Sequence, residues 1–233
     1  MTTVTVLAPA YDEEPVLGTF VFAMLDVLEP GWELLIVNDG SADLTGELAE
    51  RLAAEHESVR VVHHEVNRGL GAALATGFAE ARGEIVVAMD ADLSHPPAMI
   101  AGLVAACEDV DAVFASRFVP GGGMEGVPLL RRAISRVGNL VFRFLFWSTV
   151  RDMTTGFRAY RTSVMRDLEL TAEGFEAQLE ITVRLLRRRA AIREVPLLLS
   201  TRIAGMSKMR YLALVPRYGR AVVRLLRLRW RGR

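Results

Sequence analysis

The chain has 233 residues, 51% of them hydrophobic, and its 28 acidic and 28 basic residues give a net charge of zero. A chain of this length is expected to form one large domain with a sizeable buried core. Its single cysteine, Cys107, excludes an internal disulfide framework and fits a reducing compartment. We find no secretory signal at the N-terminus and no run of about 18 uncharged apolar residues, so we expect a cytoplasmic protein without a membrane-spanning helix.

The neutral total conceals a strong division of charge along the chain. Residues 1–116 hold 20 acids and 4 bases, whereas residues 117–233 hold 8 acids and 24 bases. Such asymmetry predicts an anionic partner for the second half, either a membrane surface or a nucleic acid. We expect no nucleic acid, because the basic C-terminal stretch has aliphatic faces and lacks interleaved stacking aromatics.

In chain order, the first half alternates short apolar runs with helical patterns. The predicted strands are 3–9, 32–39, 59–65, 84–90 and 111–116, and the predicted helices are 13–28, 42–56, 69–82 and 96–107. The apolar runs do not alternate with polar residues, as expected when helices cover both faces of a parallel sheet. This repetition predicts a doubly wound, mostly parallel α/β domain.

After Ser116 the pattern changes. A glycine-rich loop, VPGGGMEG, leads to a helical stretch over 129–147, and RDMTTGFRAYR (151–161) is predicted to be a loop. A helix near 174–189, a last strand over 192–200 and a helix from about Tyr211 follow. No linker composition separates these elements, so we expect one domain over 1–210 with a basic amphipathic helix over 211–233 appended to it.

Polar residues follow three of the predicted strands at their carboxyl ends. They are YDE at 11–13, NDGS at 38–41 and DAD at 90–92. Parallel strands end at one edge of a sheet, where open α/β sheets bind ligands, so we expect the three sets to converge. Two carboxylates one residue apart suit a hard divalent cation, Mg²⁺ or Mn²⁺, that bridges the phosphates of a nucleotide.

Some of these patterns also have ordinary structural explanations. Asp92 or Ser94 could cap the helix that follows, and Asp90 could cap a turn. NRGLGAALATG lacks the third glycine of a dinucleotide-binding motif and follows the third strand instead of the first. His63 and His64 are adjacent on a strand and therefore face opposite sides, so we do not expect them to share a metal.

Taken together, the motifs resemble the family 2 inverting glycosyltransferases, and among these the dolichyl/polyprenyl-phosphate mannosyltransferases. The segments that carry the resemblance, over about residues 4–210, are APAYDEEP, IVNDGSADLT, NRGLGAA, MDADLSHPP, SRFVPGGG, DMTTGFRAYR and RIAGMSK. The resemblance implies a GT-A fold. It also implies inverting transfer of mannose from GDP-mannose to a polyprenyl phosphate, with Mg²⁺ or Mn²⁺ as cofactor.

Carried over by position, the resemblance also implies a set of site residues. The donor would be bound by Pro9, Tyr11, Glu13, Val37, Asp39, Asp90, Ala91, Asp92, Arg117, Arg202 and Lys208. Asp90, Asp92 and Arg117 would act in catalysis. Asp92 would bind the metal, with Ser94 as a second candidate because some relatives carry a glutamine there. The acceptor phosphate would be held by Arg117, Arg131 and Ser135.

Two positions depart from the usual motifs of this family. Asp12 stands where asparagine is usual, and Asn38 stands where aspartate is usual. Asp39, the more important acid by resemblance, is retained. We therefore expect activity to be kept, whereas the preference for nucleotide or metal is open to change.

A phosphate acceptor suits these residues on chemical grounds as well. A phosphate monoester has a second pKa of about 6, so it is largely ionised at neutral pH and needs cations to position it, not a general base. Arginine forks bind phosphate oxygens well. The basic residues after the acidic edge are Arg117, Arg131, Arg132, Arg136, Arg158, Arg202 and the only lysine, Lys208. We expect TTGFRAYR and the stretch 205–209 to be mobile loops hinged at Gly156 and Gly205.

Two helical segments bear on membrane contact. The 129–147 helix has apolar residues at helical spacing, which fits either a buried core helix or an interfacial helix beside the active site. The 211–233 helix has a basic stripe at Arg217, Arg220, Arg224 and Arg227, which fits either a solvated tail or contact with anionic lipid. We favour peripheral attachment to the cytoplasmic face of a membrane, with a separate membrane-anchoring protein as a further candidate partner.

Two other functions stay open at this point. The donor could be a UDP-sugar, with glucose or N-acetylglucosamine in place of mannose. Alternatively, the chain could be a nucleotide-binding membrane adaptor without turnover. The intact Asp39, Asp90, Asp92 and Arg117 argue against the adaptor.

Overall fold

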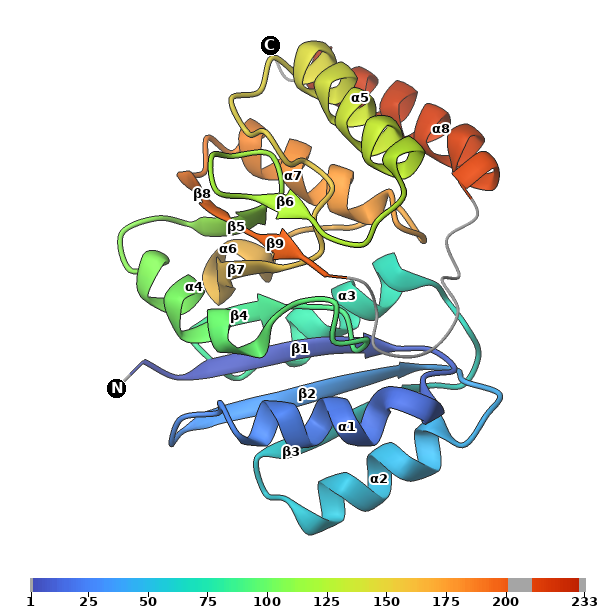
Figure 1. Cartoon of the computed structure of the whole chain (residues 1–233), viewed down its shortest axis with the longest axis vertical. Coiled ribbons are helices and arrows are strands. Elements are labelled where there is room, and N and C mark those ends of the chain that lie inside the picture. Colours follow the sequence, from blue (N-terminus) through green and yellow to red (C-terminus); the bar gives the residue numbers. More distant parts are fainter. Residues whose placement is uncertain (1, 201–210, 231–233) are drawn as a thin grey trace.

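The computed structural model describes residues 2–200 and 211–230, and within them it confirms the doubly wound architecture (Figure 1). The main sheet of the described residues has seven strands in the order β3-β2-β1-β4-β7-β5-β8. Their bounds are β1 Val4–Ala10, β2 Trp32–Asp39, β3 Val59–His64, β4 Ile85–Ala88, β5 Ala112–Ser116, β7 Arg158–Arg161 and β8 Ile192–Pro196. A second, two-stranded sheet pairs β6 (Gly123–Met124) with β9 (Leu198–Leu199).

Helices cover both faces of the main sheet, which explains why its central strands are apolar on both sides. The helices are α1 Glu14–Leu25, α2 Thr45–Glu55, α3 Leu70–Glu80, the 3₁₀ turn η1 Pro97–Met99, α4 Ile100–Ala106, α5 Leu129–Phe146, α6 Thr162–Met165, α7 Ala177–Arg187 and α8 Tyr211–Trp230. Helices α1, α2 and α4 pack into one core cluster. Helices α3 and α7 pack into the other, together with Phe146 of α5 and Leu225 of α8.

The prediction of a loop over 151–161 is wrong at its C-terminal end. Arg158–Arg161 forms β7, which lies antiparallel between β4 and β5. Arg158, which we had grouped with phosphate-binding arginines, is fully buried. Its guanidinium carbon lies 3.9 Å from the ring centroid of Phe114, and its Nη1 donates to the Gln178 carbonyl at 3.1 Å. The strand was not predicted because two of its four residues are arginines. A segment inside the sheet cannot act as the mobile loop that we expected.

The predicted last strand is also divided. Residues 192–196 form β8 in the main sheet, whereas Leu198 and Leu199 form β9 in the small sheet. The glycine-rich loop thereby gains a partner, because Gly123 pairs with Leu198 and Met124 with Leu199.

Strand register brings the polar strand ends to one edge of the sheet. In the parallel pairs, Ala10 of β1 lies opposite Asn38 of β2, and Leu7 of β1 lies opposite Ala88 of β4. Asp90 follows β4 by two residues, so it emerges beside the end of β1. Because β7 is antiparallel, the residues before Arg158 reach this same edge.

Helices α5 and α8 lie side by side at one end of the molecule (Figure 1). The rings of Phe142 and Tyr218 stack between them, with centroids 5.5 Å apart. On α8, Ala221 and Leu225 are buried against the core, so this part of the helix is not a solvated tail. Among the helices of the described residues, none combines the length and apolarity needed to cross a bilayer.

Candidate active site

The loops after β1 and β2 are joined by hydrogen bonds. The Asp12 main-chain N–H donates to Ser41 Oγ at 3.0 Å, and Asp12 Oδ1 accepts from the Ala42 N–H at 2.8 Å. The Glu13 N–H donates to Thr45 Oγ1 at 2.8 Å. Asp12 has a φ of 47°, a left-handed conformation that aspartate and asparagine tolerate better than other residues. The first two polar sets therefore form one corner, as expected.

This corner carries several negatively charged carboxylates. The carboxylate of Asp12, followed by desolvation and by the charges of Asp39 and Asp43, raises the pKa of Tyr11. The hydrogen bond of the Tyr11 phenol to the Asp12 side chain also raises this pKa, so the phenol is held beside the acids of the corner. Pro9, the other expected donor-binding residue of this strand, is partly buried. Val37 is fully buried in the core, so its side chain faces away from any ligand at the edge.

Asp39 is buried and held by three donors. His64 Nδ1 lies 2.6 Å from its Oδ1, which also accepts the Arg68 N–H at 3.0 Å. Its Oδ2 accepts the Gly69 N–H at 2.8 Å. The NRGLG segment is therefore a support for Asp39, and the glycine at 69, with a φ of 86°, allows the main chain to turn toward the carboxylate.

The loop that carries Asp90 and Asp92 is strained and well supported. Asp92 and Ser94 are buried, and Asp92 Oδ1 accepts the Ser94 N–H at 2.9 Å. Between them, Leu93 has a φ of 57°, which is unfavourable for a branched side chain and is typical of functional loops. The turn η1 that follows has Pro96 at its N-cap and no side-chain cap, so the capping explanation for Asp92 and Ser94 is wrong.

His95 supports the same loop through its side chain. Its Nδ1 accepts the Asp90 N–H at 3.2 Å, and its ring stacks on Phe157 with centroids 5.0 Å apart. Phe157 precedes β7, and its neighbour Gly156 lies against the acid: a Cβ at Gly156 would be 3.3 Å from Asp90 Oδ1. The segment before β7 thus borders the acidic loop.

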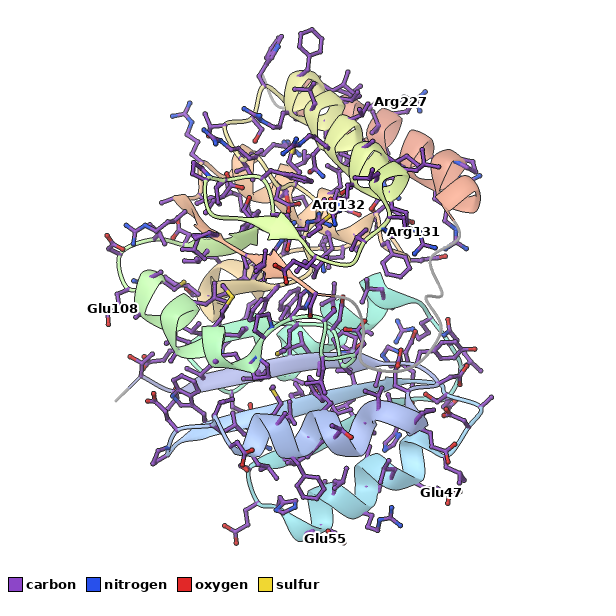
Figure 2. All side chains as sticks on the ribbon, viewed as in Figure 1. Glu47, Glu55, Glu108, Arg131, Arg132 and Arg227 are labelled. Carbon is purple, nitrogen blue, oxygen red and sulfur yellow. The ribbon has the colours of Figure 1, made fainter. Side chains whose placement is uncertain are left out.

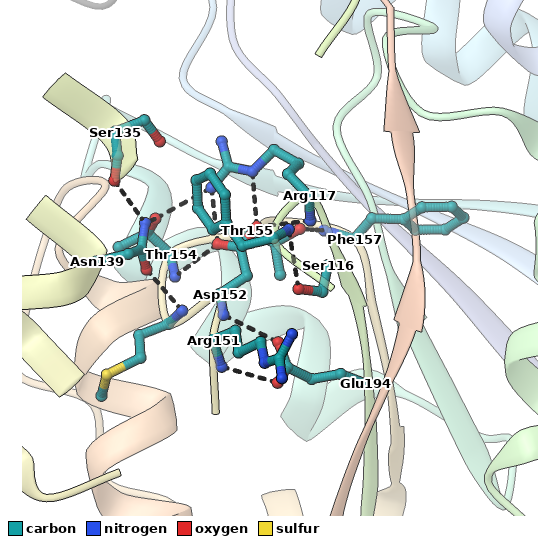
Figure 3. Close-up of polar contacts among 12 residues, drawn as sticks. Ser116, Arg117, Ser135, Asn139, Arg151, Asp152, Thr154, Thr155, Phe157 and Glu194 are labelled. Carbon is teal, nitrogen blue, oxygen red and sulfur yellow. Dashed lines mark hydrogen bonds and ion pairs between the residues drawn. The ribbon is translucent and has the colours of Figure 1, made fainter. Parts of the chain in front are cut away.

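The same segment reaches Arg117, as Figure 3 shows. Arg117 Nη2 donates to Thr154 Oγ1 at 3.1 Å, and its Nε and Nη2 each lie 2.7 Å from a different oxygen of Asp152. Burial by itself would raise the pKa of the Asp152 carboxyl, but the charge and hydrogen bonds of Arg117 outweigh burial and lower it. The main-chain N–H groups of Arg151 and Asp152 donate to Glu194 of β8, which fixes this turn.

Helix α5 is anchored to this network through Asn139. The side chain of this buried residue donates from Nδ2 to Thr154 Oγ1 at 3.0 Å and to the Ser135 carbonyl at 3.0 Å. Its Oδ1 accepts the Met153 N–H at 2.8 Å. Ser135 therefore lies one helical turn from the anchor, and Arg131, which is exposed, lies one turn further toward the helix N-terminus. Asp90 and Arg117 therefore border the same segment at one edge of the sheet, and α5 is joined to that segment through Asn139.

Comparison with known proteins identifies the family. Residues 5–169 match the model of "Glycosyl transferase family 2". The chain belongs to glycosyl transferase family 2. The motif resemblance is thereby confirmed, and the chain is a family 2 glycosyltransferase by descent.

Relatives within family 2 are similar over most of the chain. The undecaprenyl-phosphate mannosyltransferase of Micrococcus luteus is 37% identical over 88% of this chain and 87% of its own length. The polyprenol monophosphomannose synthase of Mycolicibacterium smegmatis is also 37% identical, over 88% and 80%. The dolichol-phosphate mannosyltransferase of Pyrococcus furiosus is 33% identical over 98% of this chain and 64% of its own.

Solved structures confirm the GT-A fold of this family 2 chain. Glucosyl-3-phosphoglycerate synthase from Mycobacterium tuberculosis, solved with Mn²⁺, uridine diphosphate and glucosyl-3-phosphoglycerate, superposes with a TM-score of 0.72. The alignment covers 97% of this chain and 78% of that one at 23% identity, which supports the fold alone.

Four side chains that support the candidate site were not predicted from the sequence, and some predicted residues cannot be placed. Arg202, Lys208 and the predicted hinge Gly205 lie outside the described residues. The missed residues are His64, Asn139, Asp152 and Thr154. Asp152 and Thr154 stand in the recognisable DMTTG stretch, so position offered a signal for them, whereas no sequence pattern links His64 or Asn139 to the edge.

Proposed function

We propose that this chain transfers mannose, with inversion, from GDP-mannose to a polyprenyl phosphate to give polyprenyl phosphate β-mannose. The observation that carries the proposal is the position of the segment 154–156, which borders Asp90 at Gly156 and accepts a hydrogen bond from Arg117 at Thr154. An acid of the proposed donor site and an arginine of the proposed acceptor site thereby border the same segment. The printed names of the relatives support mannose as the sugar and a polyprenyl phosphate as the acceptor.

The proposed donor site consists of the corner formed by the loops after β1 and β2 together with the loop after β4. Tyr11, Glu13 and Asp39, with Pro9 and the main chain at Val37, would meet the nucleoside, and Asp90, Ala91 and Asp92 would meet the diphosphate and sugar. Arg202 and Lys208 are included on resemblance alone.

The donor set at this edge fits a divalent cation. Within the described residues, no group of three or more His, Cys, Asp or Glu side chains is placed to hold a metal. Mg²⁺ and Mn²⁺ need only one or two protein carboxylates when nucleotide phosphates supply further oxygens. Asp92 would bind the ion, with Ser94 beside it. A bound ion would neutralise charge on the departing diphosphate.

The proposed acceptor site is formed by Arg117, Arg131 and Ser135. Asp152 fixes the guanidinium of Arg117 in position, and Asn139 sets the distance of α5 from it. An ionised phosphate oxygen attacks the anomeric carbon from the face opposite the diphosphate. The bond between the anomeric carbon and the diphosphate oxygen breaks, and its electron pair leaves with GDP. No general base is required.

We also propose that the end of the molecule formed by α5 and α8 attaches to the cytoplasmic face of a membrane. The outward stripe of α5 is exposed at Leu130 (72%), Val137 (60%) and Phe144 (76%), so the reading of a buried core helix is wrong. A groove of about 520 Å³ follows α8 and is lined by Gly219, Arg220, Val223, Arg224, Arg227 and Leu228. Apolar side chains beside arginines suit the surface of an anionic bilayer.

The enzymatic proposal is tested by incubating the protein with radiolabelled GDP-mannose, decaprenyl or dolichyl phosphate and Mg²⁺, followed by organic extraction. We expect label in the organic phase, and we expect Asp92→Ala to reduce the rate at least about 100-fold. Transfer from a UDP-sugar instead would replace the donor assignment. Absence of transfer from any donor, with nucleotide still bound, would favour the adaptor.

The membrane proposal is tested by flotation with anionic vesicles. Phe144→Glu should reduce the bound fraction about tenfold or more, since a large apolar side chain no longer enters the bilayer. Phe22→Glu is the matched control, because Phe22 is an exposed aromatic (53%) on α1. Equal binding of the two variants would contradict the assignment of α5.

A further inference from the structure

We infer that His64 is a positioning residue for the donor nucleotide: it fixes the carboxylate of Asp39 and is itself fixed by Thr76. The inference rests on the proposed function, which places Asp39 in the donor site. It adds a hydrogen-bond chain from α3 to that site that no motif in the sequence indicates.

Strand register brings the histidine to the acid. Asp39 ends β2 and His64 ends β3, and the two are direct partners in the parallel pair. Their side chains point to the same face of the sheet, are each 4% exposed and approach to 2.6 Å. His63 points to the opposite face, where it contacts Asn38 and Glu50. The two adjacent histidines thus serve different faces, as strand geometry predicts.

The protonation pattern of His64 follows from its two contacts. An ionised carboxylate only accepts hydrogen bonds, so Nδ1 must carry the hydrogen that faces Asp39. In the neutral ring, Nε2 then accepts, and Thr76 Oγ1, 2.9 Å away, donates to it. The chain therefore runs from Thr76 to His64 to Asp39. Both ring nitrogens of the buried His64 and both oxygens of the buried Asp39 carboxylate thus have a partner.

The consequence concerns which oxygen of Asp39 can meet a ligand. Oδ1 accepts from His64 and from the Arg68 N–H, which occupies both of its lone pairs. Among the described residues, Oδ2 accepts from the Gly69 N–H alone. One acceptor site is left on Oδ2, which suits a single ring N–H such as the lactam N–H of guanine or uracil. His64 keeps the carboxylate turned so that this oxygen, and not Oδ1, stays available.

The test compares His64→Leu with His64→Asn. Leucine removes the donor, whereas the amide nitrogen of asparagine lies where Nδ1 was and restores it. We expect His64→Leu to raise both the KM for GDP-mannose and the Kd for GDP about 10- to 100-fold, the usual range for a lost hydrogen bond to a charged group. The kcat should change less than about threefold, because no reacting atom is touched. His64→Asn should stay within about threefold of the parent in all three.

The controls separate this inference from the proposed function. His63→Leu should leave KM and Kd within about threefold, because His63 faces the other side of the sheet. Thr76→Val should also raise KM and Kd, but by a smaller factor than His64→Leu. This variant keeps the inference testable if His64→Leu does not fold. Unchanged GDP affinity in a folded His64→Leu, or a loss confined to kcat, would overturn the inference. GDP binding by the parent without mannose transfer would instead overturn the proposed function, and the comparison of Kd for GDP, measured by titration calorimetry, would still decide the role of His64.

Discussion

At the scale of single residues, the pair of Arg117 and Asp152 connects the acceptor side to the rest of the site. Asp152 is fully buried and the Arg117 side chain is 14% exposed, so the pair is well shielded from water. A buried ion pair contributes little net stability compared with an apolar replacement, but removal of one partner leaves an uncompensated charge. Its value here is geometric, because it fixes the guanidinium beside Thr154.

Asp152→Asn should lower the unfolding free energy at pH 7 by about 3 kcal/mol, since Arg117 then lacks its counter-ion. The folded-state pKa of Asp152 is depressed below its unfolded value of about 3.9. The stability it contributes is therefore present above that unfolded value and is lost as the pH falls through the folded pKa.

Urea denaturation of the parent and of Asp152→Asn over a range of pH measures how this contribution to the unfolding free energy depends on pH. The difference between parent and Asp152→Asn should be constant near neutrality and should shrink below about pH 4. A difference that grows on acidification would show that the carboxyl pKa is raised instead of lowered.

At the scale of elements, the start of α3 depends on a close packing contact. A Cβ at Gly71 would lie 1.7 Å from the Ala172 carbonyl oxygen, and the Gly71 N–H donates to the Glu173 carbonyl at 2.8 Å. This contact holds the segment whose Gly69 N–H supports Asp39, so the loop before α7 and the donor corner are packed together.

Gly71→Ala should therefore destabilise the fold by about 2 kcal/mol or more, because main-chain atoms must shift. Gly102→Ala in α4 is the matched control: nothing lies within 4 Å of its added Cβ, and alanine should stabilise that helix by up to about 1 kcal/mol. Thermal and urea denaturation of the two variants measure the contrast. Equal stability of both would contradict the packing described.

Helix α8 combines a packed face with a basic one. Arg224 Nη2 lies 3.0 Å from the buried carboxylate of Glu180 on α7, which ties the helix down, whereas Arg220 and Arg227 are exposed. Each exposed arginine near an anionic surface contributes about 1 kcal/mol.

Arg220→Gln combined with Arg227→Gln should therefore weaken binding to anionic vesicles about 10- to 30-fold and leave binding to neutral vesicles nearly unchanged. Added salt should reduce the difference between parent and variant. A similar loss on both vesicle types would indicate that the variant had lost its fold or its apolar contact instead.

At the scale of the whole molecule, charge is separated in space as it is along the chain. Figure 2 shows Glu47 and Glu55 at one end and Arg131, Arg132 and Arg227 on or beside the helices of the other end. The candidate site lies between the two halves of this distribution, where the acids after β1, β2 and β4 meet the arginine after β5. Under the proposed function, a cation-bound nucleotide would bind on the acidic side and an anionic lipid headgroup on the arginine side.

The folded state should be stabilised by the donor product and a metal together. At 100 times its Kd, GDP should add about 2.7 kcal/mol to the unfolding free energy, which raises the melting temperature. Mg²⁺ should increase the shift for the parent, and chelation should reverse that increase. In Asp92→Ala the shift caused by GDP should remain while the part caused by Mg²⁺ is lost. A Mg²⁺-dependent shift in that variant would remove the metal assignment of Asp92.

The sequence by itself determined the fold class and predicted the sheet edge at which the candidate site lies. Short apolar runs without alternation, repeated between helical patterns, indicate parallel strands covered on both faces. Parallel strands that are neighbours end at one edge, so Asp39, Asp90 and Asp92 were predicted to converge. The helix predicted over 129–147 is found at Leu129–Phe146, because helical spacing is a local property of the sequence.

Only the tertiary structure decided what surrounds those residues. Arg158–Arg161 becomes a central strand because Phe114 and α7 shield the Arg158 charge, and that shielding comes from distant segments. In the same way, His64 meets Asp39 across a strand pair, and Asn139 meets Thr154 across a loop. Contacts between residues far apart in sequence leave no local periodicity, because the interaction depends on how the elements pack and not on spacing along the chain.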